Sequence, residues 1–75
     1  MKAILEFNLP EDDGNFKIAA RATDWALSAW EVDQKLRCLL KYGHAFETID
    51  AAIEGMRTFL RETLDDHGVT LEDIT

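Results

Sequence analysis

Three acidic residues near the middle of this chain have a type and spacing that fit metal chemistry. Glu47, Asp50 and Glu54 fall at i, i+3 and i+7, which places their carboxylates on one face of a helix. Carboxylate oxygens are the ligands that magnesium prefers. A magnesium site on a helical bundle needs a matching acidic cluster on a second helix, and the preceding helical segment offers none. Its Glu31 and Asp33 instead precede Lys35 and Arg37 by four residues, which predicts ion pairs along that helix. We therefore interpret Glu47, Asp50 and Glu54 as a solvated face and keep a metal site as the weaker alternative.

The cysteine and histidine residues do not form a recognisable reactive group. Cys38 is the only cysteine and has no CxxC partner or histidine at ligand spacing, so we expect a small packing residue. His44 and His67 are far apart in the sequence, and His67 fits a contact at the end of a helix. No glycine-rich phosphate loop is present. The sequence predicts no catalytic residue, no cofactor and no structural metal.

A short basic stretch is the one place where the sequence could contact phosphate. Lys35, Arg37 and Lys41 lie near the end of the first predicted helix, where cations complement the helix dipole. The chain as a whole has a net charge of −7, with 15 acidic and 8 basic residues. Because lysine and arginine dominate affinity for nucleic acid, this balance argues against a nucleic-acid binder and favours a partner with a basic surface.

The N-terminal segment alternates between polar and apolar residues. In residues 2–8, Ala3, Leu5 and Phe7 share one parity, which is typical of a short half-buried β-strand. No second strand is evident, so this one would need to pair with a copy of itself or dock as an extended arm.

A long helix is predicted over residues 10–42. Pro10 suits the first helical position, with Asn8 as a plausible cap, and Gly43 is the expected terminator. No residue between positions 16 and 41 breaks it. At 1.5 Å per residue the helix would be about 48 Å long, and it is apolar on more than one face.

A shorter helix is predicted over residues 48–67, followed by a turn at residues 70–74. Thr48 is its expected cap, and Gly68 followed by Val69 is its expected terminating motif. Gly55 within it suggests a close helix contact. This helix would be about 29 Å long. The chain thus reads as one mostly α-helical domain over residues 1–75, in which a short N-terminal strand precedes an antiparallel helical hairpin.

The mismatch between the two helix lengths predicts a homodimer. A helix of about 29 Å cannot cover two faces of one that is about 48 Å long, and a tryptophan left uncovered would forgo burial of about 150–250 Å². A chain of 75 residues with a single cysteine also lacks the disulfides that stabilise many small domains. Two hairpins joined as a dimeric helical bundle would solve both problems. The expected interface residues are Phe7, Trp25, Ala29, Trp30, Val32 and Leu36.

The cellular compartment is predicted from the lack of a secretory signal and of a membrane-spanning stretch in the sequence. A single free thiol without a secretory signal is typical of a reducing cytosol, and no stretch approaches the roughly 20 apolar residues that span a bilayer. We therefore expect a cytoplasmic protein.

Two long motifs and a closing Gly68-Val69-Thr70-Leu71 resemble a family of small uncharacterised proteins encoded by tailed bacteriophages and prophages. The motifs are Ile4-Leu5-Glu6-Phe7-Asn8-Leu9-Pro10-Glu11-Asp12 and Ala29-Trp30-Glu31-Val32-Asp33-Gln34-Lys35-Leu36-Arg37, the second followed by Lys41-Tyr42. The resemblance covers nearly the whole chain. It implies a phage context in a bacterial host cell and a non-housekeeping role.

Two main functional hypotheses follow, and a third is a nucleic-acid binder that would use Lys35, Arg37 and Lys41. The first is a non-enzymatic interaction or regulatory protein of phage or prophage origin that binds a host or phage protein, in one form as an acidic inhibitor. The alternative is a minimal all-α metal-dependent enzyme similar to nucleotide pyrophosphohydrolases, for which the face of Glu47, Asp50 and Glu54 is the sole support.

Overall fold

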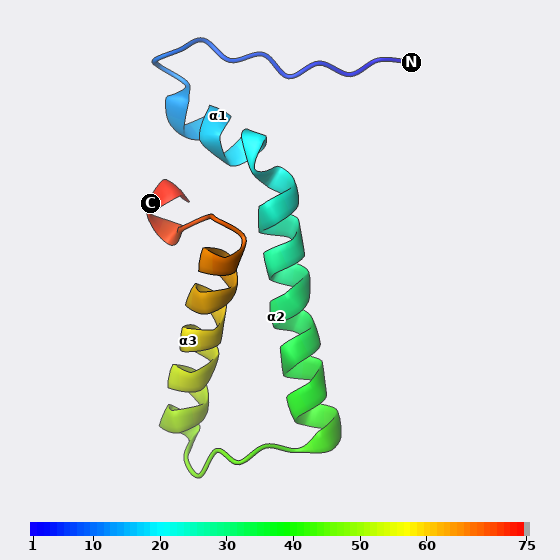
Figure 1. Ribbon diagram of the computed structural model, residues 1–75, viewed down its shortest axis with the longest axis vertical. Coiled ribbons are helices and arrows are strands. Elements are labelled where there is room, and N and C mark those ends of the chain that lie inside the picture. The colour runs from blue at the N-terminus through cyan, green and yellow to red at the C-terminus, as the bar shows by residue number, and fades with distance from the viewer. Residues whose placement is uncertain (75) are drawn as a thin grey trace.

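The computed structural model describes residues 1–74, and they are mostly α-helical, as predicted. The elements follow in the order α1 (Asp13–Ala20), α2 (Ala22–Tyr42), α3 (Ile49–Asp66) and η1 (Leu71–Ile74), a single 3-10 turn. Figure 1 shows α2 and α3 running antiparallel beside each other, joined by a loop, with α1 crossing the upper end. None of these helices combines the length and the apolar character needed to cross a membrane.

The predicted N-terminal strand does not form in the single chain. Residues 2–8 carry no strand assignment, and no strand occurs elsewhere within residues 1–74. The segment runs as an extended arm across the upper end of the molecule (Figure 1). Alternation of polar and apolar residues favours a strand only where a sheet edge supplies backbone partners, and the single chain offers no such edge.

The helix predicted over residues 10–42 is divided in two. Pro10 lies in a turn, closed by hydrogen bonds from the Asp12 N–H to the Asn8 carbonyl (2.8 Å) and from the Asn8 N–H to the Asp12 carboxylate (2.9 Å). Asn8 is therefore not the cap of a helix, and α1 begins three residues after Pro10. The break at Arg21 has φ −111° and ψ 22°, and it lets α1 turn away from α2. Gly43, with φ 88°, ends α2 as predicted.

The ends of α3 follow local chemistry. The Thr48 hydroxyl accepts a hydrogen bond from the Ala51 N–H at 3.0 Å, which confirms the predicted cap. At the other end Gly68 has φ 75°, its N–H donates to the Asp65 carbonyl, and the Val69 N–H donates to the Leu64 carbonyl, both at 3.0 Å. This is a Schellman ending, and Leu64 and Val69 are each only 3% exposed, so the expected apolar contact is formed.

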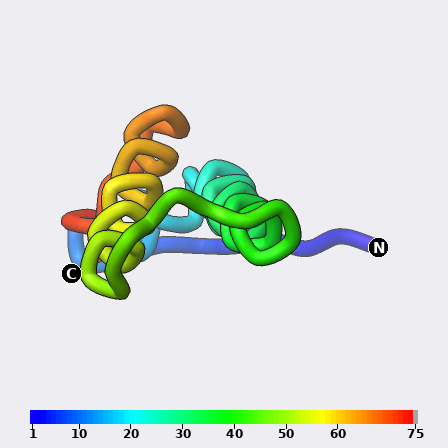
Figure 2. The backbone as a smooth tube through the Cα atoms, turned by 90° about the horizontal axis from the view of Figure 1, so that it is seen from below, coloured from blue at the N-terminus to red at the C-terminus, as the bar shows by residue number. Residues whose placement is uncertain are grey.

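The chain forms a single layer with little interior. Its extents are 49 × 30 × 17 Å and its radius of gyration is 16.2 Å, against about 11 Å for a compact domain of this length. Figures 1 and 2 show the two long helices side by side, with the loop at one end and α1, η1 and the N-terminal arm at the other. Leu64 and Val69 are the only buried hydrophobic side chains among residues 1–74. The hairpin therefore ends in a small core at one end only.

Candidate functional site

One broad side of the hairpin carries a continuous set of uncovered apolar residues. On α3, Ile49 and Ile53 are 80% and 61% exposed; on α2, Leu36 and Leu40 are 43% and 89% exposed. Adding the exposed Ala29, we call this set the open face: Ala29, Leu36, Leu40, Ile49 and Ile53. The members on α2 recur at i, i+7 and i+11, and those on α3 at i and i+4, so each helix contributes one stripe.

The loop between the helices covers the opposite side of the hairpin. Two ring carbons of Phe46 lie 2.6 and 2.9 Å from where a Cβ on Gly55 would sit. The predicted close contact at Gly55 is thus with this loop residue. Ile53 is two residues away, or about 200° around α3, so it lies on the side that Phe46 leaves open. Leu36 follows the buried Ser28 by eight residues, which at 100° per residue puts it about 80° around α2 from Ser28. This direction places Leu36 on the same side of the hairpin as Ile53.

The predicted interface residues fall in three environments. Trp25 and Val32 are half-buried, on the side of α2 near α3. Ala29 and Leu36 belong to the open face, while Trp30 is 60% exposed at the outer edge of α2. Phe7 lies elsewhere, half-buried at the base of the N-terminal arm. Its ring contacts Phe16 edge-on, with the ring centroids 5.7 Å apart.

The predicted basic patch is not one surface. The Lys35 ammonium lies 5.5 Å from the centre of the Phe59 ring, which directs this side chain toward α3. Arg37 and Lys41 point elsewhere and, with Asp33, Leu36 and Leu40, line a shallow groove on the outer side of α2. We call these five residues the outer groove.

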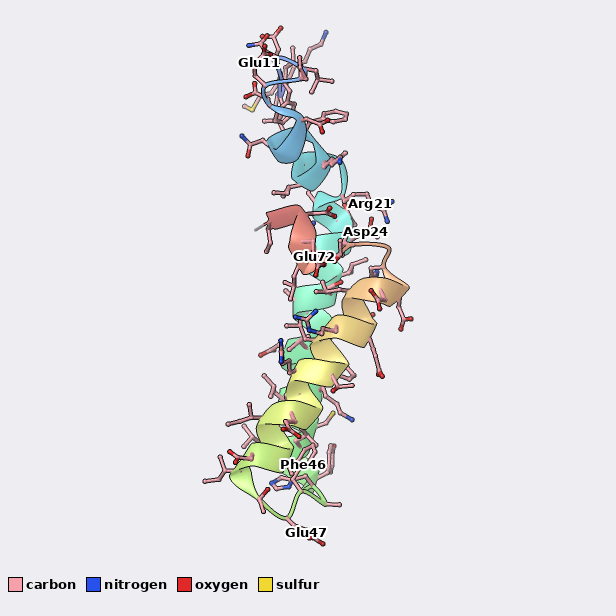
Figure 3. All side chains as sticks on the ribbon, turned by 90° about the vertical axis from the view of Figure 1, so that its left-hand side faces the viewer. Glu11, Arg21, Asp24, Phe46, Glu47 and Glu72 are labelled. Atoms are coloured by element: carbon pink, nitrogen blue, oxygen red, sulfur yellow. The ribbon has the colours of Figure 1, made fainter. Side chains whose placement is uncertain are left out.

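The acidic face proposed as a weak metal site is not assembled. Within residues 1–74, no group of three His, Cys, Asp or Glu side chains converges closely enough to hold a metal ion. Glu47 lies in the loop before α3, and Figure 3 shows it directed away from the rest of the molecule. The i, i+3, i+7 spacing with Asp50 and Glu54 presupposed a helix beginning before Glu47, whereas α3 begins after Thr48. Cys38 is exposed and unpaired.

The best-defined polar cluster was not predicted as a unit. The Arg21 Nε lies 2.8 Å from the Asp24 carboxylate, and the Arg21 Nη2 donates to the His67 carbonyl at 2.6 Å. The His67 ring lies between two acidic residues of α2, with Nε2 3.2 Å from Glu31 and Nδ1 3.8 Å from Asp24. We call Arg21, Asp24, Glu31 and His67 the polar junction. Figure 3 shows Arg21 and Asp24 beside each other at this end.

The polar junction holds the C-terminus of α3 against the N-terminal part of α2. A guanidinium at the last carbonyls of a helix complements the negative end of its dipole. Ser28 lies one turn after Asp24; it is 1% exposed, and its Oγ has no hydrogen-bond partner. The seven-residue spacing of Asp24 and Glu31 places both carboxylates on one face of a helix, and this is the sequence feature that could have predicted the cluster. The expected helical pairings of Glu31 with Lys35 and of Asp33 with Arg37 are not among the ion pairs within residues 1–74.

A second polar contact lies beyond α3. The Thr70 hydroxyl donates to the Glu72 carboxylate, and this hydrogen bond is the main reason that the pKa of Glu72 lies below its usual value of 4.5. The Glu72 N–H and the positive charge of Arg61 lower the pKa further. The contact fixes the turn that leads into η1.

The side chains thus provide an apolar surface and a structural polar cluster, and among the residues described no group of three His, Cys, Asp or Glu side chains could hold a metal ion. Comparison with protein-family models, with curated proteins and with solved structures finds no match to this chain. The surface itself is therefore the basis for a function.

Proposed function

We propose that this chain is a non-enzymatic interaction protein that works as a homodimer joined through the open face. In line with the phage and prophage proteins that its motifs resemble, it would act in the bacterial cytoplasm on a host or phage protein. The geometry supports an interaction with another protein, because the largest feature that the single chain leaves uncovered is apolar surface.

The exposed area of the chain is the observation that carries this proposal. The single chain exposes 6292 Å², whereas a folded monomer of 8.5 kDa exposes about 4,700 Å². If two copies each hide the difference, the interface buries about 3,200 Å² in total. Obligate homodimers bury about 2,000–5,000 Å². Burying apolar surface contributes about 25 cal/mol per Å². Burial of even part of this area would therefore contribute more free energy than the few kcal/mol by which a domain of this size is stable.

A face-to-face dimer is the arrangement that fits the open face. Two hairpins stacked on this side would form a four-helix bundle with Leu36 and Ile53 at its centre. The half-buried Trp25 and Val32 lie between this face and the contact with α3, so the second copy would extend an existing cluster. This arrangement supplies the core that each hairpin lacks.

The acidic surface is the part of the dimer available to another protein. Asp50, Glu54 and Asp65 are exposed along α3, within a chain of net charge −7. A protein with a basic surface, such as a groove that binds nucleic acid, is the complementary partner, and the dimer would act on it as an acidic competitor.

Sedimentation equilibrium over micromolar concentrations tests the dimer. The decisive variant is Leu36→Asp, which puts a charge at the centre of the open face. Leu27→Asp is its matched control: Leu27 is 46% exposed against 43% for Leu36, on the same helix and nine residues away, hence on the opposite side. We expect a dimer for the wild type and Leu27→Asp, and a monomer for Leu36→Asp. A wild type that stays monomeric at every concentration would refute the proposal.

The acidic partner surface needs a separate test. A tagged dimer and a variant with Asp50→Lys, Glu54→Lys and Asp65→Lys would be compared for proteins recovered from host lysate at low and high salt. We expect the wild type alone to retain a basic protein, and only at low salt, because exposed charges are screened. Equal recovery by both proteins would argue against an acidic competitor.

A further inference from the structure

The N-terminal arm, residues 1–7, leaves its backbone and most of its side chains without partners in the single chain. Residues 1–6 are exposed, with Ile4 and Leu5 at 84% and 79%. Within residues 1–74, no hydrogen bond involves the backbone of the arm, and Phe7, which packs against Phe16, is its one half-buried residue. Extended backbone with free N–H and C=O groups is a template for pairing with another strand.

The order of residues in the arm is complementary to itself when two copies run in opposite directions. With the two Ile4 residues opposite each other, residue 2 of each arm lies opposite residue 6 of the other, so Lys2 faces Glu6 twice. Ala3 faces Leu5 on the other side of the pair. Opposite charges directly across two strands stabilise the pairing, and like charges destabilise it. Neither Lys2 nor Glu6 has an ion pair within residues 1–74, so the second copy can use both charges.

Other antiparallel registers lack this match. A shift of one arm by two residues places Lys2 opposite Ile4 or Asn8, and a shift by four places two Lys2 or two Glu6 residues opposite each other. A shift by one residue mixes the two sides of the pair and places Glu6 opposite Ala3. The register centred on Ile4 therefore pairs opposite charges and also keeps the apolar parity on one side.

The position of the arm fixes how the two hairpins are oriented. Figures 1 and 2 show the arm crossing the end of the hairpin that lies away from the loop. A twofold axis along the length of the hairpin keeps these two ends together and reverses the direction of a segment that crosses it, so the arms run antiparallel. The same axis brings the loop ends together, where Leu40 and Ile49 are 89% and 80% exposed. The most exposed members of the open face then meet the same region of the second copy.

We propose that the arms of two copies pair as an antiparallel two-stranded ribbon centred on Ile4, with Lys2 of each arm beside Glu6 of the other. This inference rests on the proposed homodimer and specifies the orientation of its two copies. The second copy supplies the strand edge that the alternating pattern of residues 2–8 requires. Because a two-stranded ribbon alone is marginal, the ribbon adds to the open-face contact and does not replace it.

Exchanging the two charges tests the pairing. Lys2→Glu places two acidic residues opposite each other at both ends of the ribbon, and Glu6→Lys places two basic residues there. A mixture of the two variants restores opposite charges at both ends. The control mixture joins Lys2→Glu with Glu11→Lys, an exposed position outside the ribbon; it has the same net charges but keeps one acidic pair.

The measurements are made at low salt, where exposed charges are least screened. Sedimentation equilibrium gives the dissociation constants of the homodimers. Energy transfer between fluorophores attached to the exposed Cys38, the only cysteine of the chain, gives those of the heterodimers in the two mixtures.

The dissociation constant of each arm-variant homodimer should rise about tenfold, because two attractive pairs become repulsive, while Glu11→Lys stays near the wild type. The heterodimer of the two arm variants should return close to the wild-type constant and bind more tightly than the control mixture. A heterodimer no tighter than the control mixture, or an unchanged constant for Lys2→Glu, would overturn the arm pairing while leaving the open-face dimer standing. A monomeric wild type would remove the homodimer itself, and the arm pairing with it.

Discussion

The two ends of the hairpin differ in how much apolar surface the chain covers by itself. At the end near α1 and η1, Leu64 and Val69 are buried, and the polar junction ties α3 to α2. At the loop end, Leu40 and Ile49 are 89% and 80% exposed, although both belong to regular helices. The contrast teaches that the chain builds a small core of its own at one end, and we propose that a second copy covers the apolar residues at the other. Three predictions test this difference, beginning with the largest effect.

Truncating a leucine at each end compares the two regions directly. Leu64→Ala should lower the free energy of unfolding by about 2–5 kcal/mol, because it leaves a cavity in the one small core found among residues 1–74. Leu40→Ala should change it by less than about 0.5 kcal/mol when measured below the dimer dissociation constant. Urea unfolding followed by tryptophan fluorescence gives both values. Equal losses would show that the loop end has a core of its own.

A glycine substitution beside the polar junction, with a second one in α1 as its control, tests how the end of α3 is held. Gly68→Ala should cost about 1–2 kcal/mol: its φ of 75° disfavours a side chain, and the new Cβ would lie 2.6 Å from the Arg21 Nη2, which would lose its hydrogen bond to His67. Gly14→Ala in α1 is the control; no atom lies within 4 Å of the new Cβ, so alanine should stabilise by up to about 1 kcal/mol. Thermal unfolding distinguishes the two signs. A neutral Gly68→Ala would mean that the ending of α3 is not held by Arg21.

The smallest effect concerns the turn before η1. Thr70→Val removes the hydroxyl that lowers the pKa of Glu72, so this pKa should rise toward 4.5, which a carbon-13 NMR titration of the carboxyl group measures. Because the folded pKa lies below the unfolded one, the stabilisation is present above about pH 4.5 and is lost as the pH falls through the folded value. Thr58→Val, on the exposed surface of α3, should leave Glu72 unchanged. An unshifted pKa in Thr70→Val would assign the effect to Arg61 or the backbone instead.

The parts of the fold that sequence analysis predicted depend on residues close to one another in the chain. Thr48, Gly43 and Gly68 end their helices where expected, because capping and left-handed termination need only a few neighbouring groups. The predicted interface stays a prediction. Of its residues, Ala29, Trp30 and Leu36 are exposed on α2, and the prediction did not include the exposed Leu40, Ile49 and Ile53. The homodimer and the function remain predictions. The length mismatch from which the homodimer was predicted is not present, because α2 has 21 residues and α3 has 18.

The predictions that failed concern segments whose structure depends on residues far away in the sequence. Residues 2–8 have a strand pattern but no sheet edge to pair with, so they form an arm. The break at Arg21 lies among alanines that favour a helix; at this position its guanidinium reaches the His67 carbonyl, 46 residues away in the sequence. Glu31 faces His67, whereas local spacing had suggested a pair with Lys35.

The amino-acid sequence by itself determined that the chain is helical, where α2 ends, and where α3 begins and ends. These properties follow from short-range hydrogen bonding and from composition. Only the tertiary structure decided which side of the hairpin remains open, because that side depends on where the loop places Phe46 and on how the polar junction fixes α3 against α2. Such contacts join residues far apart in the chain, and no local pattern specifies them.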